Sequence, residues 1–388
     1  MQSHSFFTPT KVVWGRGLSN NTGEILKPYV QRKLLIVTDQ GVRNANLLQG
    51  IESSLNERNI DYCIFDQVEP NPSAEIVDRG TIVLRETNCD AVLGVGGGSS
   101  IDTAKGIAAM ANNEGKILDY EGVGKLRNPA IPLFAIPTTA GTGSEVTNST
   151  VVTNKQTSFK AAVISPYMLP IIAILDPMLT INLPQSITAA TGMDALTHAI
   201  ESYTSKQATP VSKSFAISAV KIIGENLRKS YFVGTDVESR ENMLLASMMA
   251  GAAFAQSRLG NVHAISHTFG GVFNIPHGIA NATLLPFVMK YNLPACPNEM
   301  SDIAAALGKD ISGRSAEEAA YLAIEAVQEM NRDFEIPHNI KDLGVSLDYL
   351  PQLVEDSMRS GNVFVNPRLT RAADIQAIIE NAYHGIME

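Results

Sequence analysis

Histidine and aspartate residues recur at helical spacing in two segments of the C-terminal half. His263 and His267 are four residues apart, and so are Asp194 and His198, so each pair shares a face if its segment is helical. His277 follows ten residues after His267. One carboxylate oxygen with two or three imidazole nitrogens is a donor set that suits a divalent first-row metal such as Fe²⁺ or Zn²⁺. The spacing therefore predicts a metal centre.

The surroundings of these histidines favour a metal over isolated hydrogen bonds. A single buried histidine ordinarily makes a hydrogen bond and nothing more, and an Asp/His pair on one helix can be a surface pair. Apart from Arg258, however, the segment 256–287 carries almost no charged side chains, and any charge buried there needs a partner. No cysteine accompanies the histidines, which disfavours a structural zinc site. Five candidates exceed four ligands, so one of them can lie behind a ligand or handle a proton.

A glycine-rich sequence, LGVGGGSSID, spans Leu93–Asp102 and joins an apolar run to a helical one. Glycine lets the backbone approach an anion closely, and the N-terminus of the helix offers free N–H groups. We expect Ser99 or Ser100 to cap that helix. The chemistry suits a pyrophosphate, but a tight strand-to-helix turn explains the glycine triplet equally well, since it departs from the usual G-x-G-x-x-G fingerprint.

Two further segments favour a dinucleotide. Asp39 ends the first strong apolar run, where a carboxylate can accept hydrogen bonds from ribose hydroxyls and repels a 2′-phosphate, which favours NAD over NADP. Taken alone, Asp39 is better explained as a solvated turn aspartate. The segment 137–148, PTTAGTGSEVTN, offers five hydroxyls and two glycines that can line a phosphate or nicotinamide pocket or form an ordinary polar loop.

The first half of the chain alternates strand and helix signals. Its expected strands are Leu34–Asp39, Tyr62–Phe65, Ala91–Gly98, Ile131–Thr139 and Ile171–Pro177. Helical patterns lie between them over Ala45–Arg58, Ala74–Glu86 and Ile101–Asn112. The segments Val146–Asn154 and Ser158–Ser165 alternate in polarity and predict a hairpin-like pair. Strands that alternate with helices of this length predict a parallel sheet with both faces covered.

Beyond Pro184 the pattern is helical throughout. Expected helices lie over 186–203, 210–227, 239–259, 300–307, 315–334 and 369–385. Ser315 and Glu318 have the spacing of a capping box, and Gly385 is suited to end the last helix. We therefore predict an α/β dinucleotide-binding domain with a Rossmann-like parallel sheet over residues 1–180. An all-α metal-binding domain over 181–388 follows it.

The composition excludes several classes of protein. The net charge of −9 over 388 residues argues against binding to nucleic acid or to an anionic membrane. No apolar stretch approaches the ~20 residues of a membrane span, and residues 1–17 lack the pattern of a signal peptide. Cys63, Cys89 and Cys296 are far apart in the sequence and form no disulfide framework, which favours the cytoplasm. Only 18% of residues are charged, against roughly 25% in typical domains, and this predicts surface buried against other subunits.

These motifs closely resemble those of the iron-containing (group III) alcohol dehydrogenases, a family that includes lactaldehyde reductases and 1,3-propanediol dehydrogenases. The resemblance spans nearly the whole chain. It rests on GGGSSIDTAK, PTTAGTGSEVT, LDPMLT, AATGMDALTHAIE, GAAFAQSRLGNVHAISHTFGG, IPHGIANATLLP and NPRLT. The most specific marks are the D-x-x-x-H of Asp194 and His198 and the H-x-x-x-H that precedes P-H-G.

The resemblance implies a role for each motif residue. One divalent metal per subunit, Fe²⁺ before Zn²⁺, is held by Asp194, His198, His263 and His277. His267 then lies outside the ligand set near the nicotinamide, and Phe254 lies over the substrate. The implied NAD contacts are Asp39 at the adenosine ribose, then Gly96, Gly97, Gly98, Ser99, Ser100 and Asp102 around the pyrophosphate, Thr138, Thr139, Thr142 and Ser144, and the weaker positions Asn71, Lys160 and Leu179.

The function that we expect is a metal-dependent alcohol dehydrogenase or aldehyde reductase. It transfers a hydride between NAD(H) and a short-chain primary alcohol or diol and its aldehyde. We expect the reaction in the cleft between the two domains, in a small apolar pocket to which Phe254, Val152 and Phe364 contribute. The expected partners are the small-molecule substrate and further copies of the chain in a dimer or larger homo-oligomer, with no nucleic acid and no membrane.

Three alternatives stay open. A lyase that resembles dehydroquinate synthase would share the general fold, NAD and zinc, but its phosphorylated substrate would require a basic cluster, which the segment 263–277 lacks. Polyol oxidation of the glycerol dehydrogenase type would use the same machinery. A metal-stabilised subunit of a non-enzymatic oligomer would leave the glycine loop purely structural.

Overall fold

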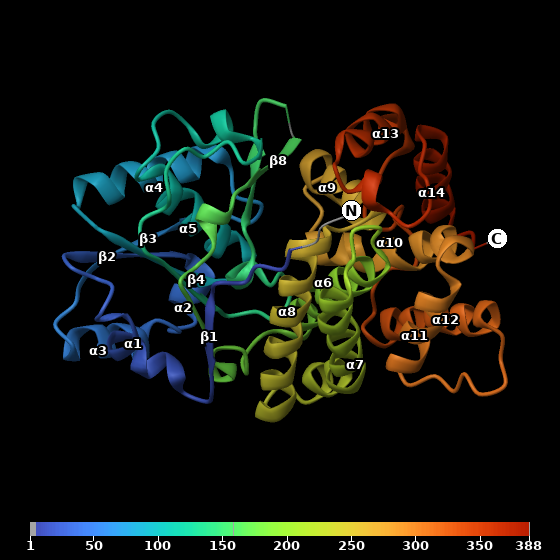
Figure 1. Ribbon diagram of the computed structural model, residues 1–388, viewed down its shortest axis with the longest axis horizontal. Coiled ribbons are helices and arrows are strands. Elements are labelled where there is room, and N and C mark those ends of the chain that lie inside the picture. The colour runs from blue at the N-terminus through green and yellow to red at the C-terminus, as the bar shows by residue number, and fades with distance from the viewer. Residues whose placement is uncertain (1–4, 158, 388) are drawn as a thin grey trace. The chain divides into compact units, whose positions relative to one another are not determined.

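The structure, a computed structural model, describes residues 5–157 and 159–387 (Figure 1). Its contacts divide the chain into two compact units, one over Thr8–Asn182 and one over Leu183–Glu388 together with the stretch that ends at Phe7. The first is an α/β unit and the second is helical. Of the N-terminal segment in which we expect no signal peptide, residues 1–4 lie outside the described part.

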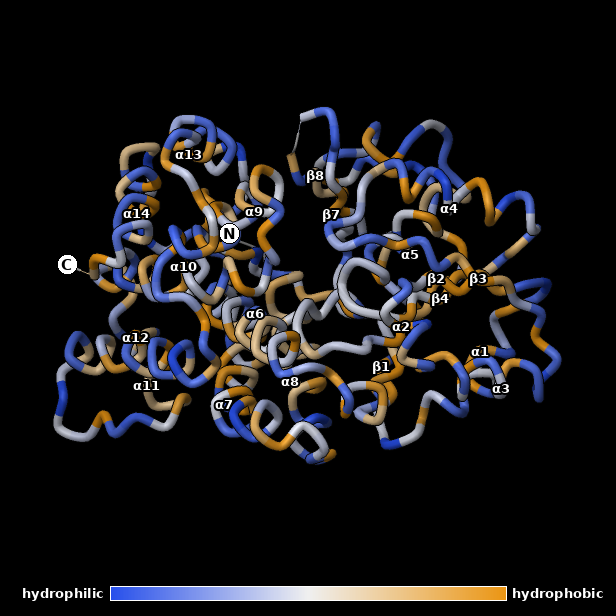
Figure 2. The backbone as a smooth tube through the Cα atoms, turned by 180° about the vertical axis from the view of Figure 1, so that it is seen from behind, coloured by the Kyte–Doolittle hydropathy of each residue, from blue (hydrophilic) through white to orange (hydrophobic). Residues whose placement is uncertain are grey.

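A six-stranded sheet forms the centre of the α/β unit. Its strand order is β1-β9-β6-β4-β2-β3, and each neighbouring pair is parallel. The strands are β1 (Lys11–Trp14), β2 (Lys33–Asp39), β3 (Asp61–Val68), β4 (Ala91–Gly96), β6 (Leu133–Pro137) and β9 (Ile172–Leu175). Because β4, β6 and β9 are buried along their whole length, they read as continuous apolar runs, and hydrophobic colour surrounds the β2, β3 and β4 labels in Figure 2. The predicted parallel sheet is confirmed.

Alternate residues of the central strands enter two different cores. The helices of this unit are α1 (Thr22–Leu26), α2 (Gln40–Asn44), α3 (Gln49–Glu57), α4 (Ala74–Glu86) and α5 (Gly98–Met110). Leu34 of β2 packs in the core that α1 and α3 share, whereas Leu35 packs in the core that α4 and α5 share. The period of two in a strand thus requires helices on both faces of the sheet. Full burial of such a leucine contributes about 1.5–3 kcal/mol.

Several element boundaries differ from the predicted ones, and three of the differences have a clear local basis. The helix predicted over Ala45–Arg58 begins only at Gln49, as α3, because Asn46 adopts a left-handed backbone with φ 55°, and α2 lies before the predicted range. The strand predicted to reach Gly98 ends at Gly96, since Gly98 already opens α5. The strand predicted over Ile131–Thr139 is confined to the five residues of β6.

A second, small sheet has the order β5-β8-β7. Strands β7 (Ser149–Asn154) and β8 (Phe159–Ile164) pair in antiparallel register from Ser149 opposite Ile164 to Asn154 opposite Phe159, and β5 (Gly122–Val123) adds a third strand. The predicted hairpin-like pair is therefore confirmed. The first residue of its second predicted segment, Ser158, lies outside the described residues.

The second unit is built from helices. Their bounds are α6 (Gln185–Thr204), α7 (Pro210–Phe232), α8 (Val237–Ser257), α9 (Asn261–Val272), α10 (His277–Asn292), α11 (Pro297–Ala306), α12 (Ala316–Asp333), α13 (Leu350–Arg359) and α14 (Ala372–His384). The predicted capping box is present at α12, where the N–H of Glu318 donates to Oγ of Ser315 at 3.2 Å and the N–H of Ser315 donates to Glu318 at 2.8 Å. Gly385 ends α14 with φ 69°. The all-α character expected of this part is confirmed.

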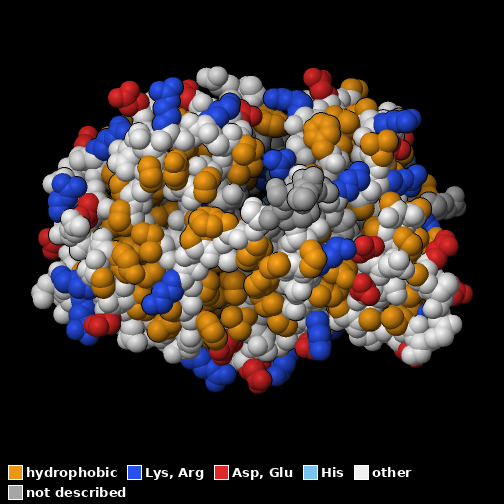
Figure 3. Space-filling view, in the orientation of Figure 1, with side chains coloured by type: hydrophobic (Ala, Val, Ile, Leu, Met, Phe, Trp, Pro, Cys, Tyr) orange, Lys and Arg blue, Asp and Glu red, His pale blue; other side chains and the backbone are white. Residues whose placement is uncertain are grey.

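The distribution of surface charge and the apolar character of the helices can be compared with the expectation of no nucleic-acid and no membrane partner. Acidic and basic side chains are interspersed on the face that Figure 3 shows. Among the described residues, none of the helices combines the length and the apolar character that crossing a bilayer requires.

Candidate functional site

Three helices of the second unit bring the four predicted metal ligands together. α6 carries Asp194 and His198 one turn apart, α9 carries His263, and α10 begins at His277. The Nε2 atoms of His198, His263 and His277 lie 4.0, 3.9 and 3.8 Å, respectively, from Oδ1 of Asp194. One ion with bonds of about 2.0–2.2 Å can bridge such atoms after small side-chain shifts.

Asp194, His263 and His277 form the tightest part of the cluster, because one ligand atom of each lies within 4.8 Å of the others. His198 adjoins this group, and its ring stacks on that of His263 with 4.6 Å between centroids. Asp194, His198 and His263 are each at most 4% exposed. Bulk water therefore solvates this carboxylate poorly, and its charge needs a partner within the site.

Glu201 lies directly behind His263, and the sequence-based prediction did not include it. Its Oε2 is 2.6 Å from Nδ1 of His263, and its Oε1 accepts the N–H of Val262 at 2.7 Å. A carboxylate in this position keeps the imidazole proton on Nδ1 and leaves Nε2 with its lone pair toward Asp194. Glu201 stands seven residues after Asp194 on the same face of α6, and that spacing is the signal that could have revealed it.

Burial dominates the electrostatics of Glu201. It raises the pKa of this carboxyl to about 7, while hydrogen bonds from the backbone of Gly260 and Val262 act in the opposite direction. A positive charge bound through His263 would favour the ionised carboxylate. The protonation of Glu201 is therefore sensitive to what the histidine holds.

Asn281 occupies the centre of the ligand atoms and was also not predicted. Its Nδ2 donates to Oδ1 of Asp194 at 2.6 Å and lies 3.1 Å from Nε2 of both His263 and His277. Its amide oxygen is buried without a hydrogen-bond partner among the described residues. Several acceptor lone pairs thus converge on one buried point, with a single amide as donor, and a cation would complete this arrangement. The residues present therefore fit a divalent metal.

His267 and Phe254 flank the ligand cluster. The ring of His267 stacks on that of His277 with 5.1 Å between centroids and meets the ring of His263 edge-on at 5.9 Å. Phe254, in the last turn of α8, stacks on His198 at 4.6 Å. The structure therefore places both residues beside the ligands, within the helical unit.

The glycine-rich loop of the α/β unit lies at the carboxyl end of β4. Gly96 has φ 146°, and a Cβ there would lie 2.7 Å from Cβ of Ser100. α5 begins at Gly98 with Gly97 as its N-cap, and no side chain caps it. The expected cap by Ser99 or Ser100 is therefore wrong, because both serines lie inside the first turn. The first N–H groups of a helix have no partner within the helix, as the anion-binding interpretation requires.

Asp39 ends β2 beside this loop. Its Oδ1 accepts the N–H of Val42 at 3.0 Å and so caps α2, and its Oδ2 accepts the hydroxyl of Ser100 at 2.9 Å. Parallel pairing of β2 with β4 brings the two carboxyl ends together. The carboxylate keeps further lone pairs after these two bonds. Asp39 thus lies against the glycine loop, where a nucleotide contact is expected.

The segment 137–148 faces the same loop. The N–H of Thr138 donates to the carbonyl of Gly96 at 3.0 Å. A Cβ added to Gly97 would lie 3.4 Å from Oγ1 of Thr139, and one added to Gly98 would lie 2.5 Å from Cγ2 of Thr142. Any side chain larger than hydrogen at Gly98 would therefore collide with Thr142. The glycine-rich loop and the segment 137–148, which are the two predicted cofactor segments, therefore lie against each other in the α/β unit.

Asp102 and Ser144 contact each other inside this unit. Asp102 accepts the hydroxyl of Ser144 and, at 2.9 Å, the N–H of Val151. Lys105, which was not among the predicted site residues, donates its Nζ to Ser144 and Thr147, both at 2.8 Å. Lys105 is completely buried, and burial lowers its pKa to about 8. These hydrogen bonds connect the segment 137–148 to α5. Asp102, Lys105 and Ser144 can therefore position the two predicted cofactor loops.

The three weaker predicted positions do not lie together. The carbonyl of Asn71 accepts the hydroxyl of Thr153 at 3.2 Å, and Thr153 pairs with Lys160 across β7 and β8. Leu179 follows β9 and packs in the core that α1 and α3 share. The structure therefore groups Asn71 and Lys160 around Thr153 and places Leu179 in a different core.

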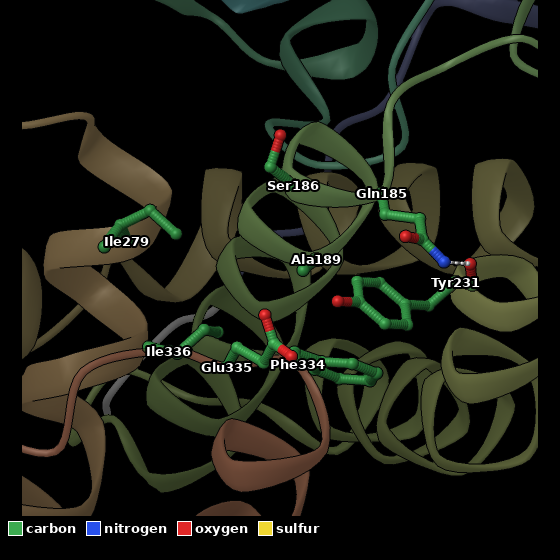
Figure 4. A pocket seen from close by; sticks show the side chains of 8 residues that line it. All are labelled: Gln185, Ser186, Ala189, Tyr231, Ile279, Phe334, Glu335 and Ile336. Atoms are coloured by element: carbon green, nitrogen blue, oxygen red, sulfur yellow. Dashed lines mark hydrogen bonds between the residues drawn. The ribbon is translucent and has the colours of Figure 1, made fainter.

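The helical unit contains a cavity whose lining includes none of the proposed metal ligands. It is lined by Gln185, Ser186, Ala189, Tyr231, Ile279, Phe334, Glu335 and Ile336 (Figure 4). None of these is a predicted site residue.

Of the two further residues expected to line a substrate pocket, Val152 packs in the core of the α/β unit and Phe364 is 73% exposed.

Two family models cover almost the whole chain. Residues 9–177 match the model described as iron-containing alcohol dehydrogenase, and residues 188–383 match the C-terminal model of the Fe-containing alcohol dehydrogenase family. A 1,3-propanediol dehydrogenase of Citrobacter freundii is 42% identical over 380 residues, 97% of this chain and 98% of that protein. An NAD-dependent methanol dehydrogenase of Bacillus methanolicus is 42% identical over 378 residues, 97% of this chain and 99% of that one.

Solved structures agree with these matches. The crystal structure of a 1,3-propanediol oxidoreductase has a TM-score of 0.95 at 42% identity and covers 98% of this chain and 100% of its own. An alcohol dehydrogenase from Oenococcus oeni has a TM-score of 0.95 at 37% identity with the same coverage. The predicted fold, an α/β Rossmann-like part followed by an all-α part, is thereby confirmed, and so is the predicted enzyme class. The chain belongs to the iron-containing alcohol dehydrogenase family.

Proposed function

We propose that this alcohol dehydrogenase interconverts short-chain primary alcohols or diols and their aldehydes, with NAD(H) as the hydride carrier and one Fe²⁺ per subunit. The observation that carries the proposal is the buried convergence of Asp194 with His198, His263 and His277, whose Nε2 atoms lie 3.8–4.0 Å from the carboxylate. The same donors suit Zn²⁺, which we keep as the alternative ion.

The ligand atoms of Asp194 and the three histidines are the groups that would hold the metal. When bound, such an ion supplies Lewis-acid polarisation of a substrate oxygen. The chain's own contribution is to keep the ligands in place. Glu201 holds His263 in one tautomer, and Asn281 holds the carboxylate of Asp194. Phe254, stacked on His198, provides an apolar surface that keeps water away from the ligands.

His267 is the residue that we propose to handle the proton. Oxidation of an alcohol releases a proton together with the hydride, and imidazole accepts and releases protons near neutral pH. His267 contacts two ligand rings and remains partly exposed, so it has access to both the site and solvent. It can therefore take the hydroxyl proton, directly or through one water, and pass it on.

In the α/β unit we propose that the glycine loop holds the pyrophosphate of NAD. The first turn of α5 supplies N–H groups, and Asp39 supplies a carboxylate for the adenosine ribose. Thr138, Thr139 and Thr142 face the loop and are suited to contact phosphate or nicotinamide. We propose further contacts with NAD at Asn71, Lys160 and Leu179. The contribution of Asp102 and Ser144 is to position the loop.

We also propose an organisation for the enzyme in the cell. Residues 1–180 would form the NAD-binding domain and residues 181–388 the metal-binding domain. A dimer or larger homo-oligomer is supported by the low charged fraction of 18%, and a cytoplasmic location by three free cysteines.

Absorbance of NADH provides the test. Enzyme loaded with Fe²⁺ or Zn²⁺ is given ethanol, propanol, 1,2-propanediol or 1,3-propanediol with NAD or NADP, and the corresponding aldehydes with NADH. We expect turnover of the short primary alcohols, with NAD preferred. Failure of all these alcohols and aldehydes with both metals would contradict the proposed substrates, and full activity after chelation would contradict the proposed role of the metal.

A further inference from the structure

The thiols of Cys63 and Cys89 lie together although 26 residues separate them, and their Sγ atoms are 3.4 Å apart. Cys63 belongs to β3, the edge strand of the large sheet, and Cys89 lies between α4 and β4. Because β3 and β4 are the two neighbours of β2, the sheet topology brings the cysteines close in space. All three cysteines are free thiols, and two of them are neighbours in space.

Thr87 arranges this pair of thiols. Its hydroxyl donates to the carbonyl of Val83 at 2.7 Å, and the same oxygen lies 3.4 Å from Sγ of Cys63 and 3.3 Å from Sγ of Cys89. The single hydroxyl proton is used on Val83, so toward the thiols this oxygen acts as an acceptor. Cys63 is partly exposed, whereas Cys89 is only 5% exposed. The pair therefore combines a partly exposed cysteine on the edge strand with a buried cysteine next to it.

The pKa values of the two thiols differ in a way that also makes Cys63 the more reactive one. The hydrogen bond with Cys89 lowers the pKa of Cys63, and the positive charge of Lys33 adds to this effect although burial opposes it. The contact with Cys63, together with burial, raises the pKa of Cys89. The thiolate is the reactive form of cysteine. Cys63 thus ionises first, and it is also the more exposed of the two.

We propose that Cys63 and Cys89 form an oxidisable dithiol site that reacts with low-molecular-weight disulfides. The Cys63 thiolate attacks one sulfur of the small disulfide, forms a mixed disulfide and expels a thiolate, which takes a proton. Cys89 then loses its proton and attacks Sγ of Cys63, which closes the Cys63–Cys89 bond and expels the second thiolate. The protein loses two electrons and two protons, and the small disulfide gains both and leaves as two thiols.

The bond requires little movement of the chain. A disulfide has an S–S distance of about 2.05 Å, so the sulfurs, now 3.4 Å apart, must approach each other by about 1.4 Å. Cys89 lies in a short connection that belongs to neither α4 nor β4 and contains Asn88 with φ 58°. Such a connection can shift without breaking the pairing of the sheet.

The dithiol lies away from the proposed cofactor residues of the same unit. Cys63 is opposite Leu35 near the start of β2, whereas Asp39 ends that strand. Cys89 precedes the first residue of β4, whereas the glycine loop follows its last. Oxidation is therefore expected to leave turnover unchanged and to alter thiol reactivity and stability.

Peptide mapping of the intact holoenzyme tests the proposal. The enzyme is incubated with oxidised glutathione, alkylated, digested without reduction and analysed by mass spectrometry. We expect a Cys63–Cys89 peptide that lacks the mass of two hydrogens, within one subunit. Cys89→Ser should stop at the glutathione adduct of Cys63, and Cys63→Ser should show neither product. Cys296→Ser is the matched control and should behave as the wild type, because Cys296 is 4% exposed and burial raises its pKa to about 12.

Alkylation rates and melting temperature give independent readouts. In the reduced enzyme, iodoacetamide should modify Cys63 at least about tenfold faster than Cys89 or Cys296. The oxidised wild type should melt at a higher temperature than the reduced one, since a cross-link restricts the unfolded chain. A persistent glutathione adduct on Cys63 of the wild type, a bond between two subunits, or equal alkylation rates for the three thiols would each overturn the proposal.

Discussion

Oε2 of Glu201 lies 2.6 Å from Nδ1 of His263, and the other oxygen of the same carboxylate accepts the backbone N–H of Val262. One side chain of α6 therefore fixes both the ring of a proposed ligand and the backbone that carries it. Partners of this kind set the tautomer and the orientation of metal-binding histidines. The metal affinity of the site should consequently depend on Glu201.

Replacement of Glu201 by alanine should weaken metal binding by about 10–100-fold. The measurement is a competition titration of metal-free protein with Zn²⁺ and a chromophoric chelator, with circular dichroism to verify the fold. Glu201→Gln is the matched control, because its amide oxygen can still accept the proton of Nδ1, and it should lose less affinity. An alanine variant that binds Zn²⁺ as tightly as the wild type would show that Glu201 has no positioning role.

Removal of the metal should both inactivate the enzyme and lower its melting temperature. An ion that binds only the folded state and is present at 100 times its Kd adds about 2.7 kcal/mol to stability. Thermal unfolding is measured before chelation, after chelation and after addition of Fe²⁺ or Zn²⁺. His263→Ala should melt like the chelated wild type and not respond to metal, whereas the exposed His338→Ala should respond as the wild type does. Identical melting curves with and without metal would argue against the site.

Replacement of Asp39 by asparagine should shift the cofactor preference toward NADP. The change removes the charge that repels a 2′-phosphate while keeping an oxygen for the N–H of Val42. The ratio of kcat/KM for NADP to that for NAD should rise at least about tenfold, which corresponds to about 1.4 kcal/mol. Asp61→Asn, an exposed position in the same unit, is the control and should leave the ratio unchanged. An unaltered ratio in the Asp39 variant would remove Asp39 from the ribose site.

Glu145 should make the stability of the protein depend on pH. The side chain is 2% exposed, and burial raises its pKa from 4.5 to about 7, with its own backbone and Lys105 opposing the shift. Between these values the folded state binds more protons than the unfolded state, so the free energy of unfolding falls as pH rises. Glu145→Gln removes this effect and should gain about 2–3 kcal/mol relative to the wild type between pH ~4.5 and ~7.

Urea denaturation at several pH values measures this difference. The exposed Glu325→Gln is the control, and its stability relative to the wild type should stay constant across the range. A constant difference for Glu145→Gln as well would mean that Glu145 titrates in the folded protein as it does in the unfolded chain.

Much of the fold was predictable because it follows from local patterns. Short apolar runs between helical segments predicted the parallel sheet, and the spacing of Ser315 and Glu318 located the start of α12. The errors arose where one residue's backbone decides the outcome. Asn46, with φ 55°, separates α2 from α3, and Gly97 takes the N-cap position of α5 in place of a serine.

The candidate site was predictable where its residues share one helix face, as Asp194 and His198 do. Asn281 and Lys105 were not, because their partners lie 87 and 39 residues away in the sequence. A buried polar side chain of this kind looks in the sequence like any residue on a helix surface. Only the packing of the helices, or of α5 against the loop after β6, reveals what it contacts.

The first turn of α10 runs from His277, a proposed ligand, to Asn281, whose amide contacts the ligand atoms of Asp194 and His277, and it directly follows Pro276. The first turn of a helix has few backbone hydrogen bonds of its own. A bound ion would therefore determine how often this turn opens, and the backbone amides of Ala280 and Asn281 should exchange with deuterium more slowly in the loaded protein. Loss of the ion would then register as local opening at one end of a single helix, well before the protein as a whole unfolds.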